Sequence, residues 1–404
     1  MGNIVNSKST DNISRTNSDS DEVANENIRV NKDIKTYSLQ RQESKKTFSS
    51  NDKEEALFDN KQNEVILKVD KELTQKQFDD FIARINVDNK ATVFKFEAPL
   101  NVKKKSTNTL NKDAFKARSI STLTSVIEKK YKNIKELKLS FPSQSESNQE
   151  IDMEPIYSIC MMLSSLKQLE SLSLNFFQWG YYNSNIKTEC LIVLCNAITI
   201  LSPSLKSLKL DFGRWGCEKY GNLKIYTDAT ISCFCDMIQS LTQLRSLDIN
   251  LRSWGYENYK ITNQSVIQIF KSVGTLVNLV DLKINLTKWG YLNNNISETS
   301  LQDLKQYLVN LQNLKHIYLN FDLWTHLHNY KYIKEALVQL PLLEQCHIDT
   351  TEEQNEVKRL YDLINYRKKQ YLMSYSMLKS GQGDYFRREI LWDALRVCLN
   401  DKKQ

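Results

Sequence analysis

One short sequence pattern recurs five times between residues 172 and 324, and it limits the possible folds more than any other feature of the chain. Each copy alternates apolar with polar residues and ends at a tryptophan, three positions after its third apolar residue. The tryptophans are Trp179, Trp215, Trp254, Trp289 and Trp324, at intervals of 36, 39, 35 and 35 residues (215 − 179, 254 − 215, 289 − 254, 324 − 289). Self-similarity at a nearly constant period is typical of proteins built by stacking one supersecondary unit. The sequence therefore predicts a repeat array, and it does not name what the array binds.

Each unit has the pattern of a strand followed by a loop and a helix. Leu172, Leu174 and Phe176 alternate with polar residues, which is the period of a strand with one buried face. Downstream of each tryptophan, apolar residues recur at spacings of three and four, as in an amphipathic helix. Thr and Ser residues near the start of these helices have hydroxyls that can accept the free amides of a first turn. The residues predicted to do so are Thr188, Thr262 and Ser297.

The start of the units resembles the leucine-rich repeat family in its ribonuclease-inhibitor-like form. The family pattern L-x-x-L-x-L is matched by Leu169, Leu172 and Leu174, by Leu244, Leu247 and Ile249, and by Leu279, Leu282 and Ile284. The resemblance implies an α/β solenoid, a horseshoe with a parallel sheet on its concave face and helices on its convex face. The tetratricopeptide and ankyrin patterns have similar periods, but each needs two helices per unit and neither explains an alternating strand.

The chain departs from the family pattern in two respects. The Asn or Cys that the family places three residues later is replaced by Phe177, Arg252 and Thr287, so the polar ladder of the family is not expected there. The units are also longer than the family's about 20–29 residues, and the extra length falls in a loop that follows each Trp-Gly pair.

Weaker copies extend the array in both directions. Strand patterns at 64–70 and 92–98, each followed by a predicted helix (75–85 and 114–131), and partial copies at 134–141 and 343–348 give about nine parallel strands. We therefore expect a solenoid over residues 61–350. Residues 1–60 are polar and lack periodicity, so we expect a disordered N-terminal tail. Residues 351–404 have helical apolar spacings, and we expect a helical C-terminal cap.

Composition and motifs favour a non-enzymatic, cytoplasmic protein without a cofactor or metal. The chain has a formal net charge of +7 over 404 residues, too mild to predict nucleic-acid binding, and eight cysteines without a disulfide-framework spacing. It has no Gly-rich phosphate loop and no nucleophile-elbow motif. His316 and His347 are out of register in the repeat frame, and no Cys or carboxylate is spaced to complete a metal site with them.

Two columns of outward-facing residues are the candidate functional surface. The first column is varied, as a partner-binding surface would be, and the second is nearly uniform in Asn and Asp, which suggests a structural ladder; a merely solvated face is the alternative for both. The first column, the predicted partner-binding site on the concave face, is Lys138, Ser173, Lys209, Asp248, Lys283, Tyr318 and His347. The second is Ser140, Asn175, Asp211, Asn250, Asn285, Asn320 and Asp349. The tryptophans are interpreted as a buried spine stacked on one another, with ligand binding as the alternative.

The functional hypothesis from the sequence is a protein-interaction scaffold or adaptor whose partner is unknown. A regulator that activates a small GTPase is the alternative, because long-helix leucine-rich arrays resemble the Ran GTPase-activating proteins; no catalytic residue carries over. Gly2 stands in a sequence close to the N-myristoylation pattern, with Asn6 in place of the hydroxyl residue. Acylation there would give weak membrane association, and an intact-mass measurement would detect it.

Overall fold

The computed structural model describes most of the predicted repeat array. The described residues are 56–61, 63–69, 75–83, 91–98, 117–143, 151–179, 181, 183–215, 226–324, 331–349 and 366. The expectations for Gly2, for the tail as far as residue 55 and for the C-terminal cap at 351–404 lie outside these residues, apart from the single helical residue Tyr366.

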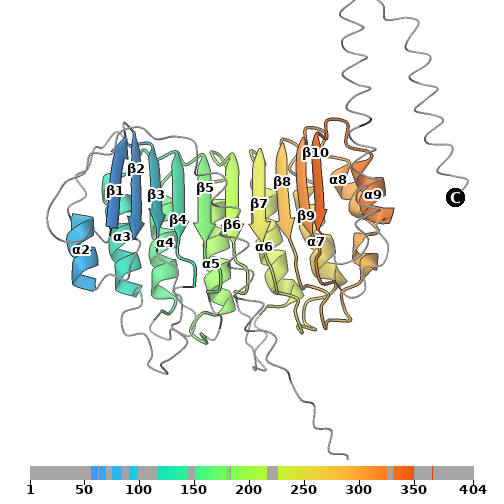
Figure 1. The fold of residues 1–404 in the computed structure, drawn as a ribbon, viewed down its shortest axis with the longest axis horizontal. Helices are drawn as coiled ribbons and strands as arrows, with labels where there is room; N and C mark the ends of the chain where they lie inside the picture. The colour runs from blue at the N-terminus through green and yellow to red at the C-terminus, as the bar shows by residue number, and fades with distance from the viewer. Residues whose placement is uncertain are drawn as a thin grey trace, which may run out of the picture. The chain divides into compact units, whose positions relative to one another are not determined.

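Ten strands form one sheet whose order in space is their order in the chain (Figure 1). Strands β2 to β10 are parallel, while β1 pairs with β2 in the antiparallel sense. The strands are β1 (Ala56–Lys61), β2 (Glu64–Val69), β3 (Val93–Glu97), β4 (Glu136–Ser140), β5 (Ser171–Asn175), β6 (Ser207–Asp211), β7 (Ser246–Asn250), β8 (Asp281–Asn285), β9 (His316–Asn320) and β10 (Gln345–Asp349). The parallel sheet is confirmed, and β1 adds a strand inside the segment that the sequence assigned to the tail.

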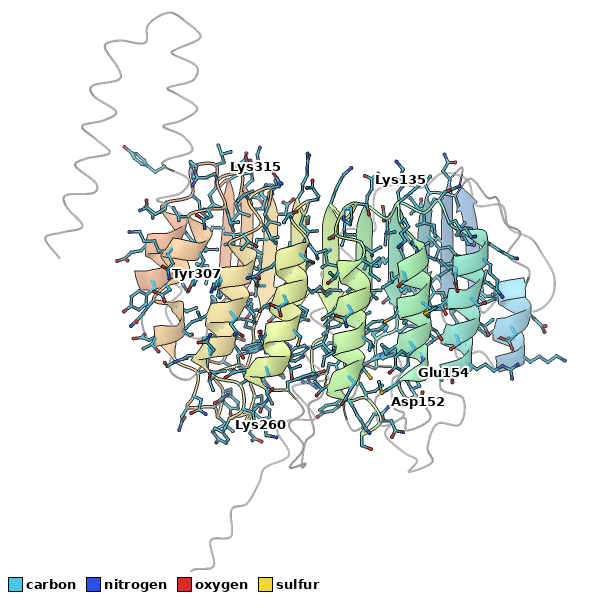
Figure 2. The ribbon with its side chains drawn as sticks, turned by 180° about the vertical axis from the view of Figure 1, so that it is seen from behind. Lys135, Asp152, Glu154, Lys260, Tyr307 and Lys315 are labelled. Atoms are coloured by element: carbon cyan, nitrogen blue, oxygen red, sulfur yellow. The ribbon has the colours of Figure 1, made fainter. Side chains whose placement is uncertain are left out.

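A helix lies in the connection between most successive parallel strands, and these helices cover one face of the sheet (Figures 1 and 2). They are α2 (Gln75–Ala83), α3 (Ala117–Lys130), α4 (Glu154–Ser165), α5 (Thr188–Thr199), α6 (Asp228–Ser240), α7 (Asn263–Val273), the 3-10 helix η1 (Glu298–Leu301), α8 (Leu304–Leu308) and α9 (Lys331–Leu337). Strands and helices thus alternate as in a leucine-rich-repeat solenoid of the α/β class, which is the fold that the sequence predicts.

The alternation within each strand follows from burial on one side. In β5 the second and fourth residues, Leu172 and Leu174, are buried against the helices, while the first, third and fifth are partly exposed. Parallel sheets are usually covered on both faces and their strands are then apolar throughout. Here the described helices cover one face, so every second residue can be polar. The other face corresponds to the predicted concave face, and we call it the open sheet face.

The predicted helix starts are confirmed at one of three positions. Thr262 is the N-cap of α7, and its hydroxyl accepts the amide of Gln264. Thr188 is wrong as a cap, since it already lies inside α5 and the preceding residue is the N-cap. Ser297 is an N-cap position, but its side chain makes no capping hydrogen bond. A capping box at Thr227, at the start of α6, was not predicted. Within the described ranges, none of the helices combines the length and apolar content that crossing a bilayer would require.

Candidate functional site

The open sheet face carries three rows of side chains that run across the strands. Because successive parallel strands are paired first residue to first residue, equivalent side chains are neighbours on adjacent strands. From β4 to β10 the starting row is Glu136, Ser171, Ser207, Ser246, Asp281, His316 and Gln345. The central row is Lys138, Ser173, Lys209, Asp248, Lys283, Tyr318 and His347. The exit row is Ser140, Asn175, Asp211, Asn250, Asn285, Asn320 and Asp349.

The exit row is a hydrogen-bonded ladder. The Nδ2 of Asn175 donates to the Ser140 hydroxyl across 3.1 Å, and that of Asn250 donates to Asp211 across 3.0 Å. The side-chain oxygens of this row also accept the backbone amide two residues later, as Asn285 does from Thr287 at 2.9 Å. Asn and Asp are well suited to this local turn. The structural interpretation of this row is confirmed, and its uniformity needs no partner to explain it.

Asp211 is the acidic member in the middle of this ladder, and its charge is poorly solvated. Its Oδ1 accepts from the Gly213 amide at 3.1 Å and from Asn250, but burial prevails and raises the pKa of Asp211 to about 6. Because the pKa of Asp211 is raised in the folded state, its neutral carboxyl group stabilises the folded protein below pH 4. That contribution to the free energy of unfolding is lost as the pH rises through 6.

Asp211→Asn should therefore stabilise the protein at neutral pH. An Asn at this position keeps both accepted hydrogen bonds and removes the buried charge. We expect a gain on the order of 1–3 kcal/mol at pH 7 that shrinks at pH 5, measured by urea unfolding at both pH values. Asp248→Asn is the matched control, because its carboxylate lies in an ion pair with the exposed Lys209 and is worth little. Destabilisation of Asp211→Asn at both pH values would contradict the prediction.

The central row differs from the exit row in exposure and in chemistry. Lys138, Lys209, Lys283 and His347 are exposed. Lys209 Nζ lies 2.8 Å from Asp248 Oδ2 on the next strand. Among the residues that the structure describes, no ion pair is seen for Lys138 or Lys283. The row offers a cation, a small hydroxyl, an ion pair and an aromatic group on successive strands, and such variety is not required by the fold.

The starting row was missed by the sequence analysis. Its members also lie on the open sheet face, since the burial alternation begins at the first residue of each strand. The signal was present in the sequence, because the residue two positions before each central-row residue continues the same period of two. Serines occupy this row on three adjacent strands, at Ser171, Ser207 and Ser246. They leave the middle of the face lined by small side chains.

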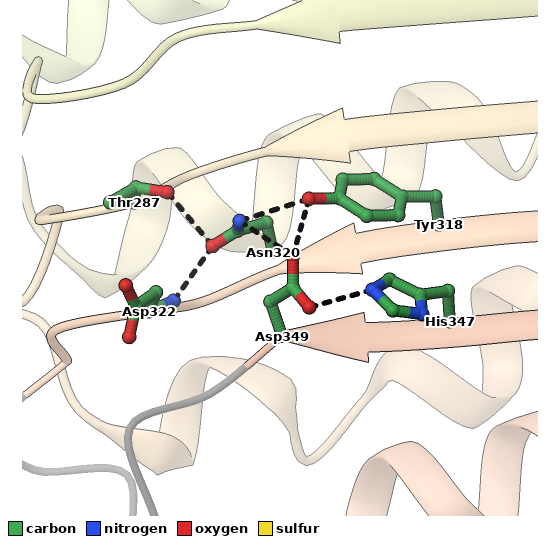
Figure 3. A network of polar contacts seen from close by, with 6 residues as sticks. All are labelled: Thr287, Tyr318, Asn320, Asp322, His347 and Asp349. Carbon is green, nitrogen blue, oxygen red and sulfur yellow. Dashed lines mark hydrogen bonds and ion pairs between the residues drawn. The ribbon is translucent and has the colours of Figure 1, made fainter. Parts of the chain in front are cut away.

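Tyr318, His347 and Asp349 form a polar cluster at the β10 end of the open face (Figure 3). The Tyr318 ring stacks on His347 with 5.1 Å between centroids, and its hydroxyl donates to Asp349 across 2.5 Å. His347 Nε2 lies 2.7 Å from the other oxygen of Asp349. Burial, and then the hydrogen bond to Asp349, raise the pKa of Tyr318. The cluster therefore holds a neutral phenol and an imidazole in a fixed arrangement.

The histidines are out of register, as the sequence predicted, but each has a carboxylate beside it. His316 pairs with Gln345 on β10 and lies 2.5 Å from Asp281 on β8, measured from Nδ1 to Oδ1. The repeat pattern did not reveal these neighbours, because strand register brings residues about 35 apart in the sequence into contact. In the described part of the chain, no group of three or more His, Cys, Asp or Glu side chains could hold a metal ion.

The tryptophans are buried in the core and are not part of the open face. Trp179, Trp254, Trp289 and Trp324 are each at most 3% exposed, and their indole N–H groups donate to backbone carbonyls of the preceding unit at 2.6–2.8 Å. For Trp254 the acceptor is the carbonyl of Phe212. The structural interpretation is thus confirmed. The stacking partners differ from the prediction, since the described ring contacts of these indoles are to phenylalanine and tyrosine.

Four cysteines in the described helices, Cys160, Cys190, Cys195 and Cys235, are also core residues, whereas Cys233 is partly exposed. Burial raises the pKa of Cys160 to about 12 and that of Cys190 to about 11. Both thiols are therefore protonated at neutral pH, which makes them poor nucleophiles and poor metal ligands.

Comparison with known proteins gives distant structural similarity only. No family model matches the chain, and no curated protein matches its sequence. Three solved structures are similar to it. The tropomodulin C-terminal domain of Caenorhabditis elegans is 12% identical, with a TM-score of 0.32, over 53% of this chain and 97% of that one. Actin-binding site 2 of leiomodin-1 is 11% identical, with a TM-score of 0.31, over 52% and 94%. A leucine-rich repeat-containing protein of Legionella pneumophila is 13% identical, with a TM-score of 0.31, over 71% and 83%.

Proposed function

We propose that the protein is a non-enzymatic scaffold that binds a protein partner on its open sheet face. The observation that carries the proposal is the contrast between two rows of the same sheet. The exit row is nearly uniform and hydrogen-bonded, as the fold requires, whereas the central row changes chemistry from strand to strand and four of its seven residues are exposed. Solenoids of stacked repeats present extended surfaces of this kind to their partners.

The chemistry of the face suits a protein better than a small molecule. The central row extends across seven successive parallel strands, and neighbouring strands lie about 4.8 Å apart, so the row is about 29 Å long. A surface of this length matches one side of a standard protein interface rather than a small-molecule pocket. The stacked Tyr318 and His347 offer an aromatic anchor at one end, and aromatic residues are enriched where interfaces derive most of their binding energy.

Reversing the charge of Lys283 tests this assignment directly. Lys283 is exposed in the central row, beside Asp248 and Tyr318 on the neighbouring strands. Lys283→Glu, alone and combined with Lys209→Glu, should reduce the recovery of the specific partner by about tenfold or more. Recovery would be measured by affinity purification with quantitative mass spectrometry from cells that express the protein. The melting temperature should barely change, because both side chains are solvent-exposed.

The matched control reverses two lysines on the helical side of the sheet. Lys271 on α7 and Lys305 on α8 are exposed, and both helices lie on the side of the sheet opposite the open face (Figures 1 and 2). The double variant Lys271→Glu and Lys305→Glu has the same net charge as the double variant of the open face. Equal loss of the partner in both double variants would show a general charge effect, and no loss in either would remove the open face from the interface.

The remaining parts of the functional hypothesis have less support. Regulation of a small GTPase stays a prediction that a GTP-hydrolysis assay with a panel of GTPases would test; no residue of the open face favours it. A cytoplasmic location and membrane association through Gly2 are kept as proposals, and the latter concerns residues outside the described ranges.

A further inference from the structure

The outer side of α4 carries an apolar surface that the fold does not need. Tyr157 and Met161 lie one turn apart on this helix and are 48% and 65% exposed. On the adjacent helix α5, Ile200 is 45% exposed, just after the last helical residue. Solvent-facing positions of a helix are normally polar or charged. Exposed apolar groups gathered in one place usually mark a surface that another molecule covers.

The repeat supplies an internal comparison for this surface. A leucine follows the end of each helix, as Leu166 follows α4. The residue five positions before this leucine is exposed in every unit from α4 to α9. From α4 to α9 that position is occupied by Met161, Asn196, Asp236, Lys271, Gln306 and Glu335. The same structural position therefore accepts polar and charged residues in the other units, and Met161 is its apolar exception. At this position the apolar character of the surface is thus particular to α4.

Helices α4 and α5 also lack charge where the other helices have it. Their only charged residues are Glu154 and Glu189, both in the first turn. Charges at the two ends of α4 are of opposite sign. Asp152 and Glu154 are exposed at its start (Figure 2), and Lys167 is exposed just beyond its end. Met161 lies seven residues after Glu154 and six before Lys167, close to the midpoint between the two charges.

We propose that this surface binds a second copy of the same chain, with the two α4 helices antiparallel and a two-fold axis close to Met161. A two-fold interface brings a surface against itself, so it must be self-complementary. Acidic and basic ends placed about 10 Å on either side of an apolar centre meet that condition. Glu154 of one copy then lies against Lys167 of the other, twice per dimer, while the two Met161 side chains pack together.

The charges on the neighbouring helices follow the same arrangement in part. The charges that do not follow it confine the proposed complementarity to α4. Helix α3 ends in the exposed lysines Lys129 and Lys130, on the same side as Lys167, and α5 starts with the exposed Glu189. Arg118 and Lys187 on the acidic side, and Glu128 on the basic side, have the opposite sign. Glu170, also on the basic side, is held by Lys135 at 3.1 Å and Lys206 at 2.6 Å. The α4 pair therefore carries the charge complementarity.

A charge-swap experiment on the full chain tests the antiparallel geometry. Sedimentation velocity across micromolar concentrations should show a monomer–dimer equilibrium for the unchanged protein. Glu154→Lys and Lys167→Glu should each raise the dimer Kd by about tenfold, since each places like charges together, and the double variant should restore it to within about threefold. Met161→Lys should raise the Kd by more than tenfold. All these residues are exposed, so the melting temperature should remain close to that of the parent.

Lys271→Glu is the control, because it changes the charge at the position equivalent to Met161 on α7. It should leave the Kd unchanged. A protein that is monomeric at every concentration would overturn the proposal, as would a dimer that is indifferent to Met161→Lys. Failure of the double variant to recover would overturn the antiparallel arrangement. The proposal does not depend on the open sheet face, so its failure would leave the partner-binding proposal as it stands.

Discussion

Replacing Trp254 by alanine should lower the free energy of unfolding by on the order of 3–5 kcal/mol. The indole is 1% exposed, and its ring stacks on Tyr226 with 4.2 Å between centroids. Its N–H donates to the Phe212 carbonyl of the preceding unit across 2.8 Å. The substitution therefore opens a large cavity and leaves a buried carbonyl with one fewer donor. Urea unfolding followed by circular dichroism would measure the loss.

Trp254→Phe separates the two contributions, because it keeps an aromatic ring and removes the N–H group. We expect it to cost less than the alanine variant and more than about 1 kcal/mol. A Trp254→Ala protein that unfolds at the same urea concentration as the parent, but no longer binds its partner, would refute the structural role and revive ligand binding by the indole column.

The alternation of apolar residues was sufficient to predict the sheet. Burial on one face requires apolar residues at every second position. In a strand of five residues, such as Ser171–Asn175, this pattern also restricts where the strand can begin and end. The helix starts were harder to predict, because capping depends on the backbone angles of one residue. Lys187 has the extended conformation of an N-cap (φ −106°, ψ 174°) although Thr188 has the better capping side chain. The N-cap of α5 was therefore predicted one residue too late.

The packing of the tryptophans depended on a turn that the sequence does not reveal. Gln178, the residue before Trp179, has a left-handed conformation (φ 64°), and the equivalent residue before Trp254, Ser253, has φ 68°. This turn returns the indole over the apolar residue that follows its own strand, so the ring centroids of Trp179 and Phe176 lie 4.6 Å apart. Gln and Ser do not predict a left-handed conformation, because Gly and Asn are the residues that usually adopt it.

The glycine that follows Trp254 has a packing reason. A Cβ atom at Gly255 would come within 2.5 Å of the Trp289 carbonyl oxygen in the next unit. The residue after Trp324 is Thr325, and no further copy of the tryptophan pattern follows it in the sequence. Gly255 is therefore explained by the stacking of its unit on the next one.

The candidate site could be predicted in part. The central row was found because it lies between the two leucines that alternate within each strand, whereas the starting row, which stands just before them, was omitted. The contacts of Asp281 with His316 join residues of different units. Such contacts depend on strand register, which a single unit does not specify.

A second polar ladder was missed because its residue lies in the loop rather than at the strand exit. Four residues after Trp179, Trp254 and Trp289 come Asn183, Asn258 and Asn293. All three are at most 2% exposed, and each donates to backbone carbonyls of the preceding unit. They connect successive units through these side chain to backbone hydrogen bonds. The shared Asn at a fixed distance from each tryptophan was the available signal.

Asn293→Ala should accordingly cost about 2–4 kcal/mol of unfolding free energy. Asn293 is fully buried, and its Nδ2 lies 2.8–3.0 Å from the carbonyl oxygens of Gly255, Asn258 and Ile261. Its Oδ1 accepts the amide of Asn295 at 3.1 Å. Truncation removes the donor that these carbonyls share, in a place where water cannot easily replace it. Urea unfolding would again be the measurement.

Asn278→Ala is the matched control, because Asn278 also donates to a carbonyl of the preceding unit, that of Thr242 at 3.1 Å, but is exposed. It should cost less than about 1 kcal/mol, since water can satisfy the carbonyl. Asn293→Asp distinguishes hydrogen bonding from volume. The carboxyl group is nearly the same size, but when ionised it places an oxygen instead of Nδ2 against the carbonyl oxygens. At pH 7 it should therefore destabilise at least as much as alanine does, and its cost should fall as the pH is lowered and the carboxyl group becomes a donor. An aspartate variant as stable as the parent at pH 7 would show that Asn293 acts by filling space, and the loop ladder would then lose its role in holding successive units together.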